Sequence, residues 1–153
     1  MTRVNLIDPD LLTDQHLFAE YREITRIFVL VQRACQKHRL ADILKKVPDS
    51  YRLGTGHVCF FYDKLAFVER RYFLLKAELQ RRQYQFTPKD DIVNFRQQID
   101  GRLYQDFQPQ AADVALSVSR LLDKIAAKPN WYRWHGDVID DEQYCQQLRR
   151  LMG

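Results

Sequence analysis

The chain contains few residues that interrupt secondary structure, with 5 glycines and 5 prolines among 153 residues. It has 3 cysteines, Cys35, Cys59 and Cys145, which are odd in number and far apart in sequence. This count argues against a disulfide-stabilised secreted scaffold and favours reduced thiols. The 4 histidines are scattered as well, so the sequence predicts neither a metal site nor a cofactor.

Long hydrophobic runs are also missing, since no stretch approaches the roughly 18 apolar residues that cross a bilayer. The N-terminal region carries Asp8, Asp10 and Asp14, where a signal peptide needs basic residues followed by an apolar segment. We therefore expect a cytoplasmic protein without a membrane partner. At 153 residues and 46% hydrophobic composition, the chain can form one globular domain with a sizeable core.

Negative charge is concentrated near the C-terminal end. Residues 137–153 contain 4 acidic residues against Arg149 and Arg150, whereas the whole chain has a net charge of +4. Residues 1–136 therefore carry a net charge of +6, a surplus that favours a polyanionic partner. We expect a main domain over residues 1–136 and an acidic C-terminal extension over 137–153 that forms a short helix.

Apolar residues recur at helical spacing along most of the chain. We predict a mainly α, single compact domain of three principal helices with irregular connections at 37–56 and 87–108. The first helix follows an N-cap at Thr13 or Asp14 and extends to about Lys37, the second spans roughly 62–82, and the third runs between Pro109 and Pro129. The predicted buried faces are Leu17, Tyr21, Ile24, Phe28, Val31 and Cys35; Phe61, Leu65, Val68, Tyr72, Leu75 and Leu79; and Ala111, Val114, Val118, Leu121 and Ile125.

Basic residues gather on the predicted polar faces of two helices. At 100° per residue, Arg22, Arg26 and Arg33 lie within roughly 40° of one another on the first helix. The corresponding residues of the third helix are Arg120, Lys124 and Lys128. One ridge alone is compatible with an ordinary solvated helix face. Two ridges on separate helices suit contacts on both sides of a phosphate backbone.

Glu23 lies between Arg22 and Arg26 on the predicted first helix, with His16 nearby. Neighbouring cations favour the ionised carboxylate. Its simplest role is an i,i+3 surface pair with Arg26, which contributes about a few tenths of a kcal/mol. A fixed carboxylate could also stabilise a cationic sugar or iminium intermediate and move protons during elimination.

Two aromatic clusters flank the predicted helices. Phe60 and Phe61 precede the second helix, and we expect them in the core. Residues 131–135 read Trp-Tyr-Arg-Trp-His after the third helix, and both core packing and ligand binding are compatible with them. Aromatic residues interleaved with basic ones suit stacking on nucleic-acid bases.

Thr2 directly follows Met1 and precedes Arg3. A small second residue normally permits removal of the initiator methionine, which leaves a free α-amine on Thr2. The unperturbed pKa of such an amine is about 7.7–8.0, and cations such as Arg3, Arg22 or Arg26 would lower it. This amine can attack a carbonyl-like carbon and form a Schiff base, although many proteins begin in the same way.

Several short motifs occur in order along the chain. They are Thr2-Arg3-x-Asn5-Leu6, Asp14-Gln15-His16-Leu17, Ala19-Glu20-Tyr21-Arg22-Glu23, Arg26, Gly56-His57-Val58, Phe60-Phe61-Tyr62-Asp63-Lys64-Leu65, Ser117-x-x-Arg120-x-x-x-Lys124-Ile125-Ala126 and Pro129-x-Trp131-Tyr132. Together they resemble the phage endonuclease V-like family of pyrimidine-dimer DNA glycosylase/AP lyases. The resemblance covers about residues 1–136, nearly the whole expected domain.

The resemblance implies a bifunctional repair enzyme for UV-damaged double-stranded DNA. In that family the N-terminal threonine amine attacks C1′ of the damaged nucleotide, displaces the base and forms an imine, and β-elimination then cleaves the strand. Carried over by position, Thr2 is the nucleophile and Glu23 the essential carboxylate. Arg3, His16, Arg22 and Arg26 would hold the lesion and its phosphates, and Arg120 and Lys124 would hold the backbone. We also expect DNA contacts from four further residues because they are basic or aromatic: Arg33, Trp131, Tyr132 and Arg133.

Two features depart from the family pattern. Trp134 and His135 stand where the type member has tyrosines, and the acidic segment from Asp137 extends past the type member's end. The same chemistry on a different damaged base therefore stays an alternative. A non-catalytic module that binds DNA damage is a second one. We expect a monomer in either case.

Overall fold

A computed structural model of the chain describes residues 3–153, so the predicted nucleophile Thr2 lies outside the described residues. The fold is mainly α, as predicted. Its α-helices are α1 (Asp14–Ile24), α2 (Arg26–Lys37), α3 (Leu40–Lys46), α4 (His57–Phe60), α5 (Leu65–Arg81), α6 (Ala111–Ala127) and α7 (Asp141–Arg150). The short 3-10 helices are η1 (Pro9–Leu11), η2 (Asp90–Gln97) and η3 (Gly101–Leu103). Within residues 3–153, no helix is long and apolar enough to cross a membrane.

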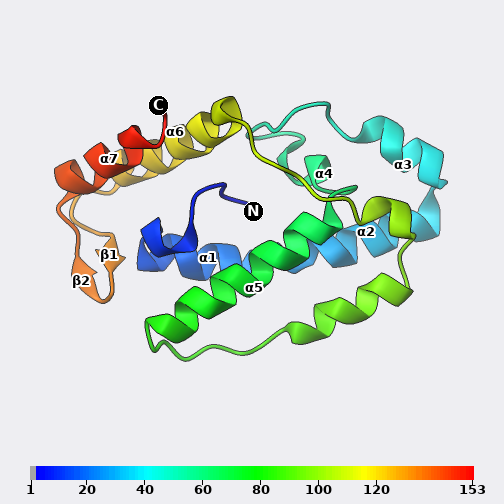
Figure 1. The fold of residues 1–153 in the computed structure, drawn as a ribbon, viewed down its shortest axis with the longest axis horizontal. Helices are drawn as coiled ribbons and strands as arrows, with labels where there is room; N and C mark the ends of the chain where they lie inside the picture. Colours follow the sequence, from blue (N-terminus) through cyan, green and yellow to red (C-terminus); the bar gives the residue numbers. More distant parts are fainter. Residues whose placement is uncertain (1–2) are drawn as a thin grey trace.

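The helices are arranged around the N-terminal segment. In Figure 1, α6 and α7 lie along one side, α5 crosses α1 and α2, and α3 lies at the opposite end from the hairpin of β1 (Arg133–Trp134) and β2 (Asp137–Val138). The chain from residue 3 to η1 runs between α6 and the α1–α5 pair (Figure 1). It is therefore surrounded by elements from distant parts of the sequence.

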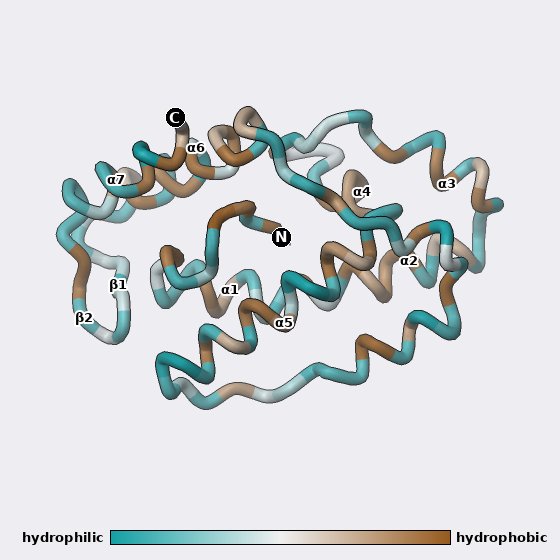
Figure 2. Tube along the Cα trace, in the orientation of Figure 1, coloured by the Kyte–Doolittle hydropathy of each residue, from teal (hydrophilic) through white to brown (hydrophobic). Residues whose placement is uncertain are grey.

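The predicted apolar faces form the core. In the first and second predicted helices, the apolar residues are buried except Cys35, which is partly exposed. In the third, Val118, Leu121 and Ile125 are buried, whereas Ala111 is exposed. Phe60 and Phe61 are also buried, as expected. Hydrophobic and hydrophilic segments accordingly alternate along the helices in Figure 2.

The prediction of one continuous helix up to Lys37 was wrong at Thr25. This residue ends α1 and precedes α2, and its backbone angles of φ −69° and ψ −17° are close to 3-10 geometry. A β-branched residue fits the helix interior less well than an unbranched one. Thr13, in contrast, is the predicted N-cap of α1, and its hydroxyl accepts a hydrogen bond from the His16 N–H at 3.2 Å.

The sequence prediction also missed several shorter elements, among them α3 and the β1–β2 hairpin. The connection predicted over 37–56 contains α3, which forms because Ile43 is buried while Leu40 and Leu44 pack against the core at helical spacing. The segment around residues 131–138 forms the β1–β2 hairpin, in which Arg133 pairs with Val138 and Trp134 with Asp137. A two-residue turn of this kind requires positive φ, which His135 (52°) and Gly136 (84°) adopt.

The C-terminal extension packs onto the rest of the molecule. The helix expected there is α7, which contacts α6 and buries Tyr144 and Leu148. The Tyr144 hydroxyl donates a hydrogen bond to the Leu11 carbonyl at 2.5 Å. Because β1 and β2 pair across residue 136, the residues on both sides of the expected boundary share one hairpin.

Arg82, directly after α5, holds the turn before α1. Its fully buried guanidinium donates hydrogen bonds to Glu78 at 2.8 Å and to Asp14 at 2.9 Å. It also donates to the carbonyls of Pro9, Asp10 and Leu12 at 2.9–3.2 Å. A single buried cation therefore satisfies two carboxylates and three carbonyls.

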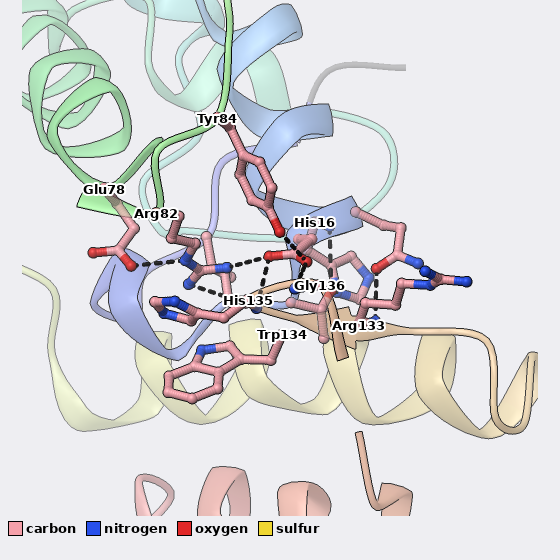
Figure 3. A network of polar contacts seen from close by, with 12 residues as sticks. His16, Glu78, Arg82, Tyr84, Arg133, Trp134, His135 and Gly136 are labelled. Atoms are coloured by element: carbon pink, nitrogen blue, oxygen red, sulfur yellow. Dashed lines mark hydrogen bonds and ion pairs between the residues drawn. The ribbon is translucent and has the colours of Figure 1, made fainter. Parts of the chain in front are cut away.

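Asp14 connects this network to the hairpin; Figure 3 shows Arg82, Tyr84 and Gly136 of this network. Its carboxylate accepts hydrogen bonds from the backbone N–H groups of His135 at 3.1 Å and Gly136 at 2.8 Å, and from the Tyr84 hydroxyl at 2.6 Å. Burial alone would raise the pKa of Asp14, but the hydrogen bonds from Tyr84, Gly136 and Arg82 lower it. The ionised carboxylate thus fixes the hairpin turn against the first turn of α1.

We expect Arg82→Met to lower the free energy of unfolding by about 3–5 kcal/mol, because it leaves buried carboxylates without a partner. Urea denaturation measures this change. Arg81→Met is the matched control, since Arg81 also pairs with Glu78 but its side chain is 64% exposed; we expect a loss below about 1 kcal/mol. Equal losses for the two variants would contradict the framework role of Arg82.

Candidate active site and DNA-facing surface

A buried ion pair fixes the N-terminal segment. Glu20 of α1 and Arg71 of α5 are 2% and 5% exposed, and two guanidinium nitrogens donate to the Glu20 carboxylate at 2.7 and 3.1 Å. Arg71 also donates to the Ile7 carbonyl at 2.5 Å, and the Asn5 side-chain amide donates to Glu20 at 2.8 Å. Residues 5–7 are therefore held against the α1–α5 helix pair.

Glu23, the predicted essential carboxylate, lies one helical turn after Glu20 on α1. Arg26 donates a hydrogen bond to Glu23 at 2.6 Å, which confirms the expected i,i+3 pair. This hydrogen bond lowers the pKa of Glu23, so the carboxylate is ionised at neutral pH. Arg3 and Arg26 line one cavity of about 430 Å³, together with the glycines and side chains around Val58 and Tyr62. Arg3, at the beginning of the described chain, and Arg26, the partner of Glu23, thus border the same cavity.

A larger cleft of about 910 Å³ lies between α1 and α6. Its basic residues are Arg22, Arg120, Lys124, Lys128 and Arg133, and its aromatic residues are Phe18, Tyr84, Trp131 and Tyr132. The two predicted basic ridges therefore meet here through Arg22 on one wall and the residues of α6 on the other. Arg26 lines the cavity near Arg3, and Arg33 lines another cavity of about 330 Å³ beside α3.

His16 forms part of the wall of the cleft. It is 9% exposed, and its ring stacks on Tyr132 with a centroid separation of 4.6 Å. Its Nδ1 lies 2.9 Å from the Thr13 hydroxyl. Burial, together with the charges of Arg120 and Lys124, lowers the pKa of His16 to about 4. The imidazole is therefore neutral at physiological pH.

Arg120 and Lys124, the two residues of α6 that are predicted to contact the DNA backbone, differ in their surroundings. Arg120 is partly buried and donates to the Asn5 side-chain carbonyl at 3.3 Å, so it connects α6 to the N-terminal segment. Burial lowers the pKa of Arg120, with the charge of Arg3 as the next cause. Lys124, one turn further along α6, is exposed at the cleft. Lys124 is thus the better placed of the two for a solvent-screened phosphate contact.

The aromatic cluster after α6 divides between core and surface. Tyr132 is 4% exposed, whereas Trp131 and Trp134 are 48% and 45% exposed. Gln15 of α1 joins the cluster through two hydrogen bonds, to the Trp131 carbonyl and from the Arg133 N–H, each 2.9 Å long. These bonds leave the indole of Trp131 and the side chain of Arg133 at the surface (Figure 3 shows Arg133).

Sequence reasoning assigned no role to Glu20 or Arg71. Both are ionisable residues directly beside core positions, Tyr21 in the first helix and Tyr72 in the second. Opposite charges placed at the edges of two buried faces are a signal for a buried pair, because a charge in the core requires a partner. Within residues 3–153, no group of three or more His, Cys, Asp or Glu side chains is placed to hold a metal ion.

Residues 1–92 match the model of a protein family described as pyrimidine dimer DNA glycosylase. The chain belongs to this family. The matched stretch includes the N-terminal segment, Glu20, Glu23, Arg26 and α5, so it contains the buried ion pair and the cavity beside Arg3. A DNA glycosylase acts on DNA, which agrees with the basic cleft. In this glycosylase α6, the hairpin and α7 lie beyond the matched residues.

We expect Lys124→Ala to weaken binding of the glycosylase to damaged and undamaged duplexes alike. One lost phosphate contact should reduce the slope of log K against log salt concentration by about 0.9. Fluorescence anisotropy at several salt concentrations measures both quantities. Arg150→Ala serves as the control, since Arg150 is exposed on α7 and lines neither cavity. An unchanged slope for Lys124→Ala would argue against DNA contact by α6.

Proposed function

We propose that this glycosylase releases the damaged base at cyclobutane pyrimidine dimers through the α-amine of Thr2 and then cleaves the strand as an AP lyase. One observation carries the proposal: Arg3, the residue after Thr2, lines the same cavity as Arg26, which holds the ionised Glu23. A terminal amine and a fixed carboxylate in one region are the groups that imine chemistry requires.

The proposed sequence begins with attack of the Thr2 amine nitrogen on C1′ of the damaged nucleotide. The bond from C1′ to the base nitrogen breaks, and the base leaves with its electron pair and takes up a proton as the amine loses one. The C1′–O4′ bond then breaks, O4′ takes up a proton, and the nitrogen lone pair forms the C1′=N bond of the protonated imine. Removal of a proton from C2′ then expels the 3′ phosphate oxygen. Glu23 is suited to stabilise the cationic intermediates and to accept protons, since Arg26 keeps it ionised.

DNA is proposed to lie across the cleft between α1 and α6. The positive charge of Arg22, Lys124 and Lys128 suits phosphates on both walls. The exposed rings of Trp131 and Trp134 offer surfaces for base stacking. We further propose that the enzyme works as a monomer in the cytoplasm. A different damaged base, or binding without catalysis, would appear as a distinct outcome in the experiment below.

We expect Glu23→Gln to retain duplex binding within about twofold while base release falls by about 10²–10⁴-fold, the usual contribution of acid–base groups. The measurement is single-turnover cleavage of the glycosidic bond and of the strand on a duplex with one thymine dimer. Glu142→Gln on α7 is the matched control and should behave as wild type.

Activity of Glu23→Gln equal to that of wild type would remove Glu23 from the mechanism. Wild-type cleavage at abasic sites but not at dimers would indicate another lesion. Binding without cleavage of either substrate would favour the damage-binding module.

A further inference from the structure

Two buried side chains form hydrogen bonds with the peptide groups that follow Arg3. Nε2 of His57 accepts a hydrogen bond from the Val4 N–H at 2.9 Å, and the Tyr51 hydroxyl donates to the Val4 carbonyl at 3.0 Å. Val4, Tyr51 and His57 are 1%, 5% and 1% exposed. The Val4 N–H belongs to the peptide bond after Arg3, so two consecutive peptide planes are held at the start of the described chain.

The direction of these bonds fixes the tautomer of His57. Its Nδ1 lies 2.8 Å from the Arg52 carbonyl, which can only accept, so Nδ1 carries the proton and Nε2 is a free acceptor for Val4. A protonated imidazole has no acceptor and would lose the Val4 bond. The contact therefore depends on a neutral His57.

Tyr51 and His57 lie at the two ends of one short loop. Gly56 precedes α4 with φ 91°, a left-handed conformation, and a Cβ there would lie 3.0 Å from Cδ of Arg52. A larger residue would disturb the loop between Tyr51 and His57. The geometry of this loop therefore explains the Gly56-His57-Val58 motif independently of any chemistry at Glu23.

The surroundings of His57 keep it neutral. The rings of Tyr51 and Phe61 pack edge-on against it, at centroid separations of 5.4 and 5.7 Å. Burial is the main cause that lowers the pKa of His57 to about 4; the hydrogen bond to Arg52 opposes this, and the charges of Arg3 and Arg120 add to it. Nε2 of His57 therefore remains an unprotonated acceptor at every pH at which a terminal amine is nucleophilic.

We propose that His57, assisted by Tyr51, is a positioning residue that holds the Val4 peptide so that the terminal amine of Thr2 is presented to the DNA beside Glu23. This inference rests on the proposed function. Thr2 is two residues from Val4, and two residues span at most about 7 Å. Fixing the Val4 peptide therefore restricts the volume that the amine can reach, which reduces the entropy lost on attack.

The test measures borohydride trapping on an abasic-site duplex under single-turnover conditions, with saturating enzyme, alongside binding affinity and thermal unfolding. We expect His57→Leu to reduce the trapping rate by about 10–100-fold, the usual effect of misplacing a reacting group, with DNA affinity within about twofold. His57→Gln should recover most of the rate, because its amide oxygen can accept the Val4 N–H. His38→Leu, at an exposed histidine after α2, should match wild type.

A folded His57→Leu variant that traps as fast as wild type would overturn the positioning role. If His57→Leu does not fold, Tyr51→Phe decides, since it removes only the hydroxyl bond to Val4: a rate several-fold lower at saturating DNA supports the proposal, and an unchanged rate overturns it. A wild-type enzyme that traps no DNA through Thr2 would instead refute the proposed function, and the inference with it.

Discussion

The arrangement of the site depends on the buried ion pair between Glu20 and Arg71. It joins α1 to α5 and, through Asn5 and the Ile7 carbonyl, holds the N-terminal segment against this helix pair. A buried pair of this kind adds little net stability compared with apolar packing, but removing one partner is costly. Its main effect here is therefore geometric. Glu23 lies one helical turn after Glu20, so the N-terminal segment is hydrogen-bonded to the same helix, α1, that carries the candidate catalytic carboxylate.

Several arginines of the chain differ in burial and therefore in the role of their charge. Arg71 and Arg82 are buried and hydrogen-bonded to carboxylates and backbone carbonyls, so their charge is used inside the fold. Arg22 and Arg26 on α1 and α2 are exposed, as is Arg133 on the hairpin. Exposed arginines such as these are available to an external polyanion. The net charge of the chain thus overstates the positive charge that is accessible to DNA. The exposed charges around the cleft are a better measure of it.

The regular helices could be predicted because their apolar residues repeat locally, and α5 and α6 follow that pattern closely. The hairpin could not, since its turn is fixed by Asp14, more than 120 residues earlier in sequence. Likewise, the peptide at Val4 is held by Tyr51 and His57, and Leu6 donates to Ser117 from 111 residues away. Such contacts leave no periodic signal. The i,i+3 spacing predicted the Glu23–Arg26 pair correctly, whereas the burial of His16 and the partial burial of Arg120 depend on packing between α1, α6 and Tyr132.

In the proposed mechanism, a terminal amine held by this framework reacts with damaged DNA. The most direct measurement is borohydride reduction of the enzyme on a duplex with one cis-syn thymine dimer, followed by intact mass and peptide mapping. The proposed chemistry requires a covalent adduct on the α-amine of Thr2 in protein that has lost Met1, and none in protein that retains it. An adduct on a lysine, or no adduct from the processed enzyme on either a dimer or an abasic duplex, would contradict it.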